Sequence, residues 1–523
     1  MLLPIQTNNF NLKTIPYFKG NSNIDIPLGT NLIPEGYSMV YFSDFHSNIS
    51  RLPKIAGLID YIESKLKNER LFKTCAGDFL FGSSERNSDI IIKILNKLNL
   101  SAIVPGNHEF DLKLTSLKEL LKKVRFPVLA SNLKENNDLP VKDYITTQIN
   151  NNNFGVIGIT TPVDNPKKFK GQMNFIETVF NIQQKVNELT RNGINKIILV
   201  SHAGLNNDQQ IAKQTRGIDI IISSHDHYNI DGIKQDINLF KSNSNEPIAI
   251  FQAAKNNNYL GYARVAFDKN GILTHIFNKT IPTSTKIKEN KEILSLIKQH
   301  SNLNPISYSL NDLNIDTINY SENALANFVT DTIKKQLNNA DIVLLTSRMV
   351  RSDLKKGKIS ELTINEVLPD RNNKKIESFV ILNLPGYKIK SLINSLNRLA
   401  DSSLGRIMTH VSGLKYKINK NLESIDFEFI NRNGLKEKLL SDKTYNVAIP
   451  GYLYNLKKFE NLGLNQYHVV ECSNKTAGDL VINYLKTNPG IIKANTDNRI
   501  TFENRLDPLF EKFNLPNYVE IVI

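Results

Sequence analysis

Cysteine and tryptophan are nearly missing from this chain, which has two cysteines and no tryptophan in 523 residues. Cys75 and Cys472 cannot build a disulfide framework, so the fold must depend on hydrophobic cores. Hydrophobic residues make up 40% of the chain and charged residues 22%, which is typical of globular proteins. The length is sufficient for two or three domains.

Long hydrophobic runs are also missing, and no stretch approaches the ~18 apolar residues that a membrane-spanning helix requires. The apolar start at residues 1–5 is shorter than the segment of about 7–15 residues in a secretory signal. The first charged residue is Lys13. We therefore expect no transmembrane segment and, by default, a cytoplasmic protein.

Acidic residues are fewer than basic ones, and the net charge is +14. A lysine-rich solvated surface is the plain explanation, and attraction of anionic substrates is the functional one. The chain has no single long basic run with interleaved aromatic residues, which disfavours specific nucleic-acid binding.

Five short apolar runs each end in a polar motif. Such runs predict buried strands, and ligands bind beyond the carboxyl ends of parallel strands. The five motifs therefore predict one common site. The runs lie at 39–42, 71–75, 102–104, 197–200 and 220–222.

The motifs contain Asp, His and Asn side chains, which are the types that bind metal ions. Five of the nine histidines lie in these motifs. A lone histidine is usually a surface or core residue, but chance explains this clustering poorly. Carboxylate and imidazole ligands without thiolates favour Mn, Fe, Co, Ni or Zn. A carboxylate can bridge two cations about 3.5–4 Å apart, and Asp78 is our candidate. The predicted ligands are Asp44, His46, Asp78, Asn107, His202, His225 and His227.

The motif order D-x-H, G-D, G-N-H-E, H and H-x-H resembles the metallophosphoesterase superfamily. The Phe-Asp that completes the stretch at 106–111 narrows the resemblance to the 5′-nucleotidase and UDP-sugar hydrolase family. The resemblance implies that His108 stabilises charge developing on the phosphate and that Asp111 orients His108. It also implies two divalent cations, one held by Asp44, His46, Asp78 and His227, the other by Asp78, Asn107, His202 and His225.

The resemblance implies a four-layered α/β catalytic domain followed by a smaller α/β substrate domain. Residues 411–416 resemble the "SGL" strand of the family's second domain, and 443–448 resemble its "TYxVA" strand. The expected segments are an extended arm at 1–35, the catalytic domain at 36–285, a linker helix at 286–304, the substrate domain at 305–490 and an extension at 491–523.

The predicted substrate residues depart from the family pattern. Arg351, with Arg348 or Arg398, can clamp an anionic group, because arginine binds phosphate or carboxylate with two hydrogen bonds. The family stacks the nucleoside base between two aromatic side chains. This chain offers Met408 or Ile407 on one side and at most Phe459 on the other. We therefore expect intact phosphate chemistry and an altered nucleoside pocket.

The sequence thus predicts a 5′-nucleotidase-type phosphohydrolase that releases phosphate from a small substrate, with a nucleotide as the expected one, through a hydroxide activated by two cations. A phosphodiesterase or general phosphatase with another substrate is the alternative among enzymes. A non-catalytic metal-containing binding protein is the alternative from another class, and His108 and Asp111 argue against it. A nuclease of the DNA-repair branch is disfavoured by the second domain. The metal, oligomeric state and compartment stay open, since relatives often act outside the cytoplasm.

Overall fold

A computed structural model gives the conformation of most of the chain, which divides into two compact units, Met1–His300 and Ser301–Ile523. The described residues are 13–14, 26, 28–66, 69–81, 87–134, 138–162, 171–369, 378–398, 400–401 and 405–503.

The first unit contains two six-stranded sheets, with strand orders β1-β12-β11-β2-β3-β4 and β5-β6-β7-β8-β10-β9. Strands β2, β3 and β4 pair in parallel, as do β6, β7, β8 and β10. The strands of the first sheet are β1 (Lys13–Thr14), β2 (Tyr37–Phe42), β3 (Phe72–Cys75), β4 (Ala102–Ile103), β11 (Tyr259–Phe267) and β12 (Leu273–Pro282). Those of the second are β5 (Tyr144–Ile149), β6 (Asn152–Ile159), β7 (Ile197–Ser201), β8 (Ile220–Ile222), β9 (Leu239–Lys241) and β10 (Pro247–Phe251).

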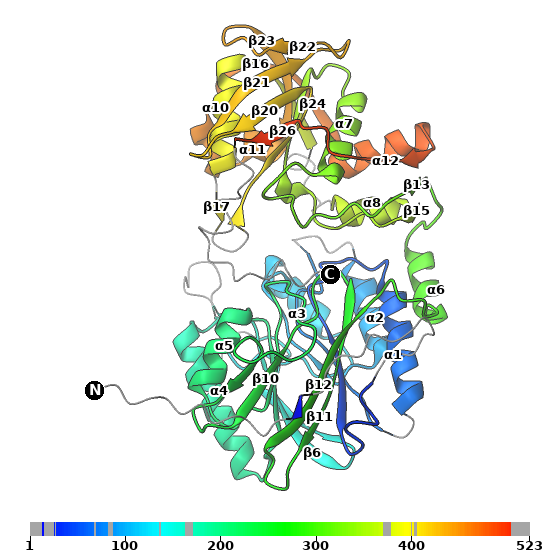
Figure 1. Cartoon of the computed structure of the whole chain (residues 1–523), viewed down its shortest axis with the longest axis vertical. Coiled ribbons are helices and arrows are strands. Elements are labelled where there is room, and N and C mark those ends of the chain that lie inside the picture. Colours follow the sequence, from blue (N-terminus) through cyan, green and yellow to red (C-terminus); the bar gives the residue numbers. More distant parts are fainter. Residues whose placement is uncertain are drawn as a thin grey trace, which may run out of the picture. The chain divides into compact units, whose positions relative to one another are not determined.

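Helices cover both outer faces of this pair of sheets. Figure 1 shows α1 and α2 on one side and α4 and α5 on the other. One core joins the facing sides of the two sheets, and another joins the second sheet to α4 and α5. The four-layered α/β prediction is confirmed. The helices are α1 (Leu52–Leu66), α2 (Ser88–Leu98), α3 (Leu114–Leu121), α4 (Phe175–Arg191), α5 (Leu205–Gln214) and α6 (Lys291–His300), with the 3-10 turn η1 (Glu109–Asp111).

The predicted linker helix is shorter than 286–304, because α6 begins at Lys291 and ends at His300. Residues 286–290 are not helical. They pack on the first unit, where Asn290 donates its backbone N–H to the carbonyl of Pro53 at 2.9 Å. The buried side chains of α6 are Ile293 and Ile297, and the helix contacts α1 and α2. This connection therefore packs on the first unit.

Part of the predicted N-terminal arm is also packed. Arg264, which is fully buried, donates to the carbonyls of Ile33 at 2.7 Å and Pro34 at 2.9 Å. The same guanidinium donates to Ser38 and pairs with Glu69. A buried charge is tolerated only when it is paired and hydrogen-bonded in this way. Of residues 1–35, the structure describes 13–14, 26 and 28–35.

The second unit is built around a five-stranded sheet of order β19-β14-β23-β16-β24, with a four-stranded sheet β22-β21-β20-β26 and a three-stranded sheet β15-β13-β25. The strands are β13 (Ser307–Ser309), β14 (Ile342–Thr346), β15 (Gly357–Ile359), β16 (Ser378–Pro385), β17 (Ala400–Asp401), β18 (Gly405–Arg406), β19 (Thr409–Ser412), β20 (Leu414–Ile418), β21 (Ser424–Ile430), β22 (Lys436–Lys438), β23 (Thr444–Pro450), β24 (Val469–Thr476), β25 (Ile491–Ile492) and β26 (Ile500–Phe502).

Hydrophobic cores on both faces of the five-stranded sheet hold the helices of this unit. These are α7 (Ala324–Gln336), α8 (Glu361–Val367), α10 (Gly386–Arg398), α11 (Gly451–Asn455) and α12 (Ala477–Thr487). Three 3-10 turns are η2 (Ser347–Met349), η3 (Lys457–Leu462) and η4 (Leu464–Gln466). The mixture of strands and helices confirms the second α/β domain.

Residues 491–492 and 500–502, which the sequence placed in an extension, are strands in the sheets of the second unit. Strand β25 pairs in parallel with β13, and β26 pairs in parallel with β20. Arg499 strengthens this attachment by donating to Asp331 at 2.7 and 3.0 Å and to the carbonyl of Val411 at 3.1 Å. Strands of two and three residues leave too little pattern in the sequence to be predicted.

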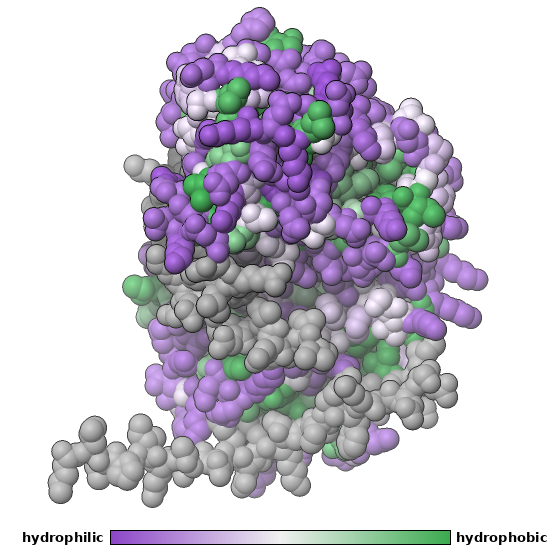
Figure 2. All heavy atoms as spheres, turned by 45° about the horizontal axis from the view of Figure 1, so that its top comes forward, coloured by the Kyte–Doolittle hydropathy of each residue, from purple (hydrophilic) through white to green (hydrophobic). Residues whose placement is uncertain are grey.

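The described part of the chain has no helix that is both long and apolar enough to span a bilayer. The face drawn in Figure 2 is mostly hydrophilic, and its hydrophobic side chains occur in small separate groups. Scattered exposed hydrophobic residues are normal on a protein surface.

Candidate metal centre

The site is built where the predicted strands of the first unit end. Asp44 and His46 follow β2, and their backbone N–H groups donate to the carbonyls of Gly77 and Asp78, both at 3.0 Å. The loops after β2 and β3 are thus joined by backbone hydrogen bonds, which brings their polar side chains together.

The backbone turns sharply at most of the predicted ligands. Five of the seven have positive φ, in the left-handed region that non-glycine residues rarely adopt. These sharp turns let residues from several strand ends approach one another. The φ angles are 52° at Asp44, 47° at His46, 51° at Asp78, 86° at His225 and 67° at His227.

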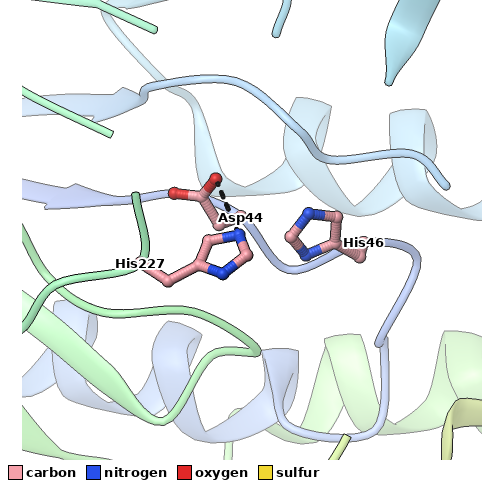
Figure 3. A group of neighbouring side chains, drawn as sticks. All are labelled: Asp44, His46 and His227. Atoms are coloured by element: carbon pink, nitrogen blue, oxygen red, sulfur yellow. Dashed lines mark ion pairs between the residues drawn. The ribbon is translucent and has the colours of Figure 1, made fainter. Parts of the chain in front are cut away.

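One cluster contains Asp44, His46 and His227, each of which offers a ligand atom within 4.8 Å of the others. Figure 3 shows the three side chains converging, with the ion pair between Asp44 and His227 drawn as a dashed line. Oδ1 of Asp44 lies 3.7 Å from Nε2 of His227.

A second cluster with the same spacing contains Asp78, His202 and His225. Oδ2 of Asp78 lies 3.2 Å from Nε2 of His202 and 3.4 Å from Nε2 of His46, which belongs to the first cluster. One carboxylate therefore reaches both clusters, as a bridge between two cations must.

An unsatisfied buried atom shows that this donor set fits a cation. Among the described residues of the site, Oδ1 of Asn107 is buried and makes no hydrogen bond. A buried polar atom without a partner is costly, and a cation would satisfy it. Nδ1 of His202 faces the carbonyl of Ala76 at 2.6 Å and Oγ of Ser224 at 2.8 Å. Such partners orient a histidine so that its other nitrogen is free for a metal.

The electrostatics of these buried side chains also favour positive charge in the site. Burial raises the pKa of Asp44 to about 7. Burial acts to lower the pKa of His202, but Asp78 and Asp44 outweigh it and raise this pKa to about 10. The buried carboxylates of Asp44 and Asp78 thus favour positive charge beside them, and a divalent cation would supply it with His202 deprotonated, as a metal ligand must be.

Glu109 is a contributor that the sequence reasoning did not single out. Its fully buried carboxylate accepts backbone N–H groups from Asp78 at 3.0 Å, Leu80 at 2.7 Å and Gly106 at 2.6 Å. Glu109 therefore ties the loop after β3 to the loop after β4. Its place inside the G-N-H-E motif was the available signal.

His108 and Asp111 lie together as predicted. Nδ1 of His108 is 2.7 Å from Oδ2 of Asp111, and the backbone N–H of His108 donates to Oδ1 of Asp78 at 2.9 Å. The rings of His108 and His46 are 5.2 Å apart. His46, Asp78 and His108 also form a compact group of potential ligands.

Three predicted substrate residues are half-buried in the second unit. Arg348 lies in η2 at the end of β14, and Arg351 follows and donates its backbone N–H to Val367 at 2.9 Å. Phe459 is half-buried and packs on Tyr452 with ring centroids 5.6 Å apart. Tyr452, which the sequence reasoning missed, hydrogen-bonds to Thr346 just before η2.

Two other predicted substrate residues are placed differently. Met408 is fully buried in a core of the second unit, where the hydroxyl of Tyr416 donates to its sulfur at 3.7 Å. A base cannot stack on a side chain that is enclosed by the core. Arg398 is exposed near the end of α10 and pairs with Glu423 at 2.8 Å, which is a surface ion pair.

We predict that Met408→Ala changes stability and not substrate choice. Truncating a buried methionine should lower the free energy of unfolding by about 2–5 kcal/mol, whereas Met408→Leu should cost less than about 1.5 kcal/mol. Urea denaturation measures both values. A changed ranking of substrates by kcat/KM in the Leu variant would return Met408 to the substrate site.

Comparison with known families finds two matches along the chain. The calcineurin-like phosphoesterase family matches residues 38–229, and the 5′-nucleotidase C-terminal domain matches residues 300–460. Snake venom 5′-nucleotidase of Gloydius brevicauda is 24% identical over 445 residues, which cover 75% of this chain and 72% of that protein. Apyrase of Anopheles gambiae is 23% identical over 497 residues, which cover 87% and 86%. Among solved structures, a 5′-nucleotidase precursor from Thermus thermophilus has a TM-score of 0.67 at 22% identity and covers 90% of this chain and 99% of that chain.

Proposed function

Because the chain belongs to the family that joins a calcineurin-like phosphoesterase domain to a 5′-nucleotidase C-terminal domain, we propose that it releases phosphate from nucleotides with the help of two divalent cations. The chain is a nucleotidase-type hydrolase of phosphate esters. The number of cations, the residues that hold them and the nucleotide substrate are the parts that this proposal adds.

One observation supports the two-cation site above all. Asp78 reaches both histidine clusters, at 3.2 Å from His202 and 3.4 Å from His46. Asp44, His46, Asp78 and His227 would hold one cation, and Asp78, Asn107, His202 and His225 the other. When bound, the cations would supply Lewis acidity and lower the pKa of water.

His108 and the two arginines would act on the substrate, and Asp111 would act through His108. His108 would donate a hydrogen bond to the phosphate as negative charge develops there, and such preorganised donors stabilise a transition state. Asp111 holds Nδ1 of His108 at 2.7 Å and fixes the direction of the ring. Arg351, with Arg348, would bind an anionic group of the substrate with paired hydrogen bonds.

The test uses purified full-length protein, stripped of metal with a chelator and then supplied with Mn²⁺ or Zn²⁺. We expect phosphate release from nucleoside monophosphates only after the metal is added. UDP-sugars, cyclic nucleotides and an aryl phosphate complete the panel. Cleavage of cyclic nucleotides alone would indicate a phosphodiesterase, and full turnover without metal would contradict the proposal.

We also predict weak discrimination among bases, with kcat/KM differing less than about tenfold among four nucleoside monophosphates. One stacked base contributes ~1–3 kcal/mol, and the core position of Met408 removes one of the two predicted contacts. Initial rates at low substrate concentration measure the ratios. A preference above about a hundredfold, or ~2.7 kcal/mol, would show that a specific base pocket exists.

A further inference from the structure

Asp226 stands between His225 and His227 in the H-x-H motif that follows β8. Its carboxylate accepts a hydrogen bond from the backbone N–H of Leu205, the first residue of α5. The loop that leads into α5 carries His202. Asp226 therefore connects the loop with two predicted ligands to the loop with a third.

The start of α5 is shaped to receive this carboxylate. Gly204 occupies the position before the helix with φ 91° and offers no side chain to accept the first N–H groups. A Cβ on Gly204 would lie 3.0 and 3.1 Å from the two carboxylate oxygens of Asp226, so glycine leaves room for the contact. The first N–H groups of a helix need acceptors, and negative charge is favourable there.

The H-x-H loop needs an anchor because of its conformation. His225 and His227 both have positive φ, 86° and 67°, which non-glycine residues adopt only at a cost in free energy. The backbone N–H of His225 faces the carboxylate oxygens of Asp44 at 3.3 Å. The rings of His202 and His225 are 5.2 Å apart. The hydrogen bond from the backbone N–H of Leu205 to Asp226 joins the two loops that carry these histidines.

We propose that Asp226 is a positioning residue that holds His225 and His227 in place relative to His202 and thereby increases the affinity for divalent cations. The role rests on the proposed two-cation function. Outer partners of metal ligands typically change metal affinity by about 10–100-fold when they are removed.

The test compares Asp226→Ala with Asp226→Asn in the full-length chain. Both variants remove the charge, but asparagine keeps an oxygen acceptor and caps a helix about as well as aspartate. Competition with a fluorescent chelator measures the affinity for Mn²⁺ and Zn²⁺. We expect Asp226→Ala to bind at least about tenfold more weakly, and Asp226→Asn to bind like the wild type.

Excess metal distinguishes positioning from a general loss of structure. At saturating Mn²⁺ the kcat of Asp226→Ala should return to the wild-type value, and thermal melting confirms that the variant is folded. Unchanged metal affinity in Asp226→Ala, or an equal loss in Asp226→Asn, would overturn the role of Asp226 alone. A wild-type protein that binds no divalent cation would overturn this role together with the proposed function.

Discussion

Replacing Asp78 by asparagine is expected to lower kcat/KM by more than about 10³-fold, or ~4 kcal/mol, and to remove bound metal. Oδ2 of Asp78 lies near one histidine of each cluster, while its Oδ1 accepts the backbone N–H of His108. Asparagine has one neutral oxygen, and its NH2 group must face either the His108 N–H or the two clusters, so it cannot serve both and bridges two cations poorly. Losing the bridge should affect both metal positions together.

The measurement is metal content after gel filtration, together with kcat/KM for an aryl phosphate at saturating Mn²⁺. Asp89→Asn is the matched control, because it makes the same chemical change at an exposed carboxylate that pairs with Lys123 in the same unit. We expect the control to keep its metal and its activity. Normal metal content in a folded Asp78→Asn variant would contradict Asp78 as the bridge.

His108→Ala should lower kcat by about 10²–10³-fold, the usual effect of losing one preorganised donor. Metal content should stay unchanged, because the proposed ligands are all retained. The two measurements together identify a group that acts on the substrate and does not hold the metal.

Asp111→Asn provides the comparison for His108. It alters the hydrogen bond to Nδ1 of His108 but leaves the backbone bond from His108 to Asp78 in place. We expect a smaller loss of kcat, roughly tenfold. If His108→Ala loses metal, the compact group of His46, Asp78 and His108 would be a ligand set instead.

The first unit was predictable because its strands are short, apolar and ended by polar motifs. Spacing alone paired Asp44 with His46 and His225 with His227. The structure places Asp44, His46 and His227 in one group and Asp78, His202 and His225 in the neighbouring one. Their roles as ligands stay predictions. The sequence did not show the residues that support the predicted ligands. Glu109 accepts the backbone N–H of Asp78, and Ser224 donates to the backbone carbonyl of Ser201. Contacts with backbone atoms leave no pattern in the sequence.

The second unit was less predictable. The sequence around an apolar residue beside a strand does not indicate whether its side chain lies in the hydrophobic core or lines a substrate pocket. Met408 lies next to β19 and fills the core, although its position in the family pattern suggested contact with a base. Strands β25 and β26 are too short for a periodic pattern, and only their pairing with β13 and β20 defines them.

The left-handed backbone at the predicted ligands has a consequence for the evolution of this chain. Mutation to glycine at such a position relieves roughly 1–2 kcal/mol of conformational cost, but it removes the side chain that would donate to a cation. Natural proteins often lose function when they are selected for stability alone. Selection for heat resistance without any demand for activity is therefore expected to enrich glycine at these strand ends while the sheets persist. The sites of enrichment would then mark the metal centre without any substrate having been identified. The five positions are Asp44, His46, Asp78, His225 and His227.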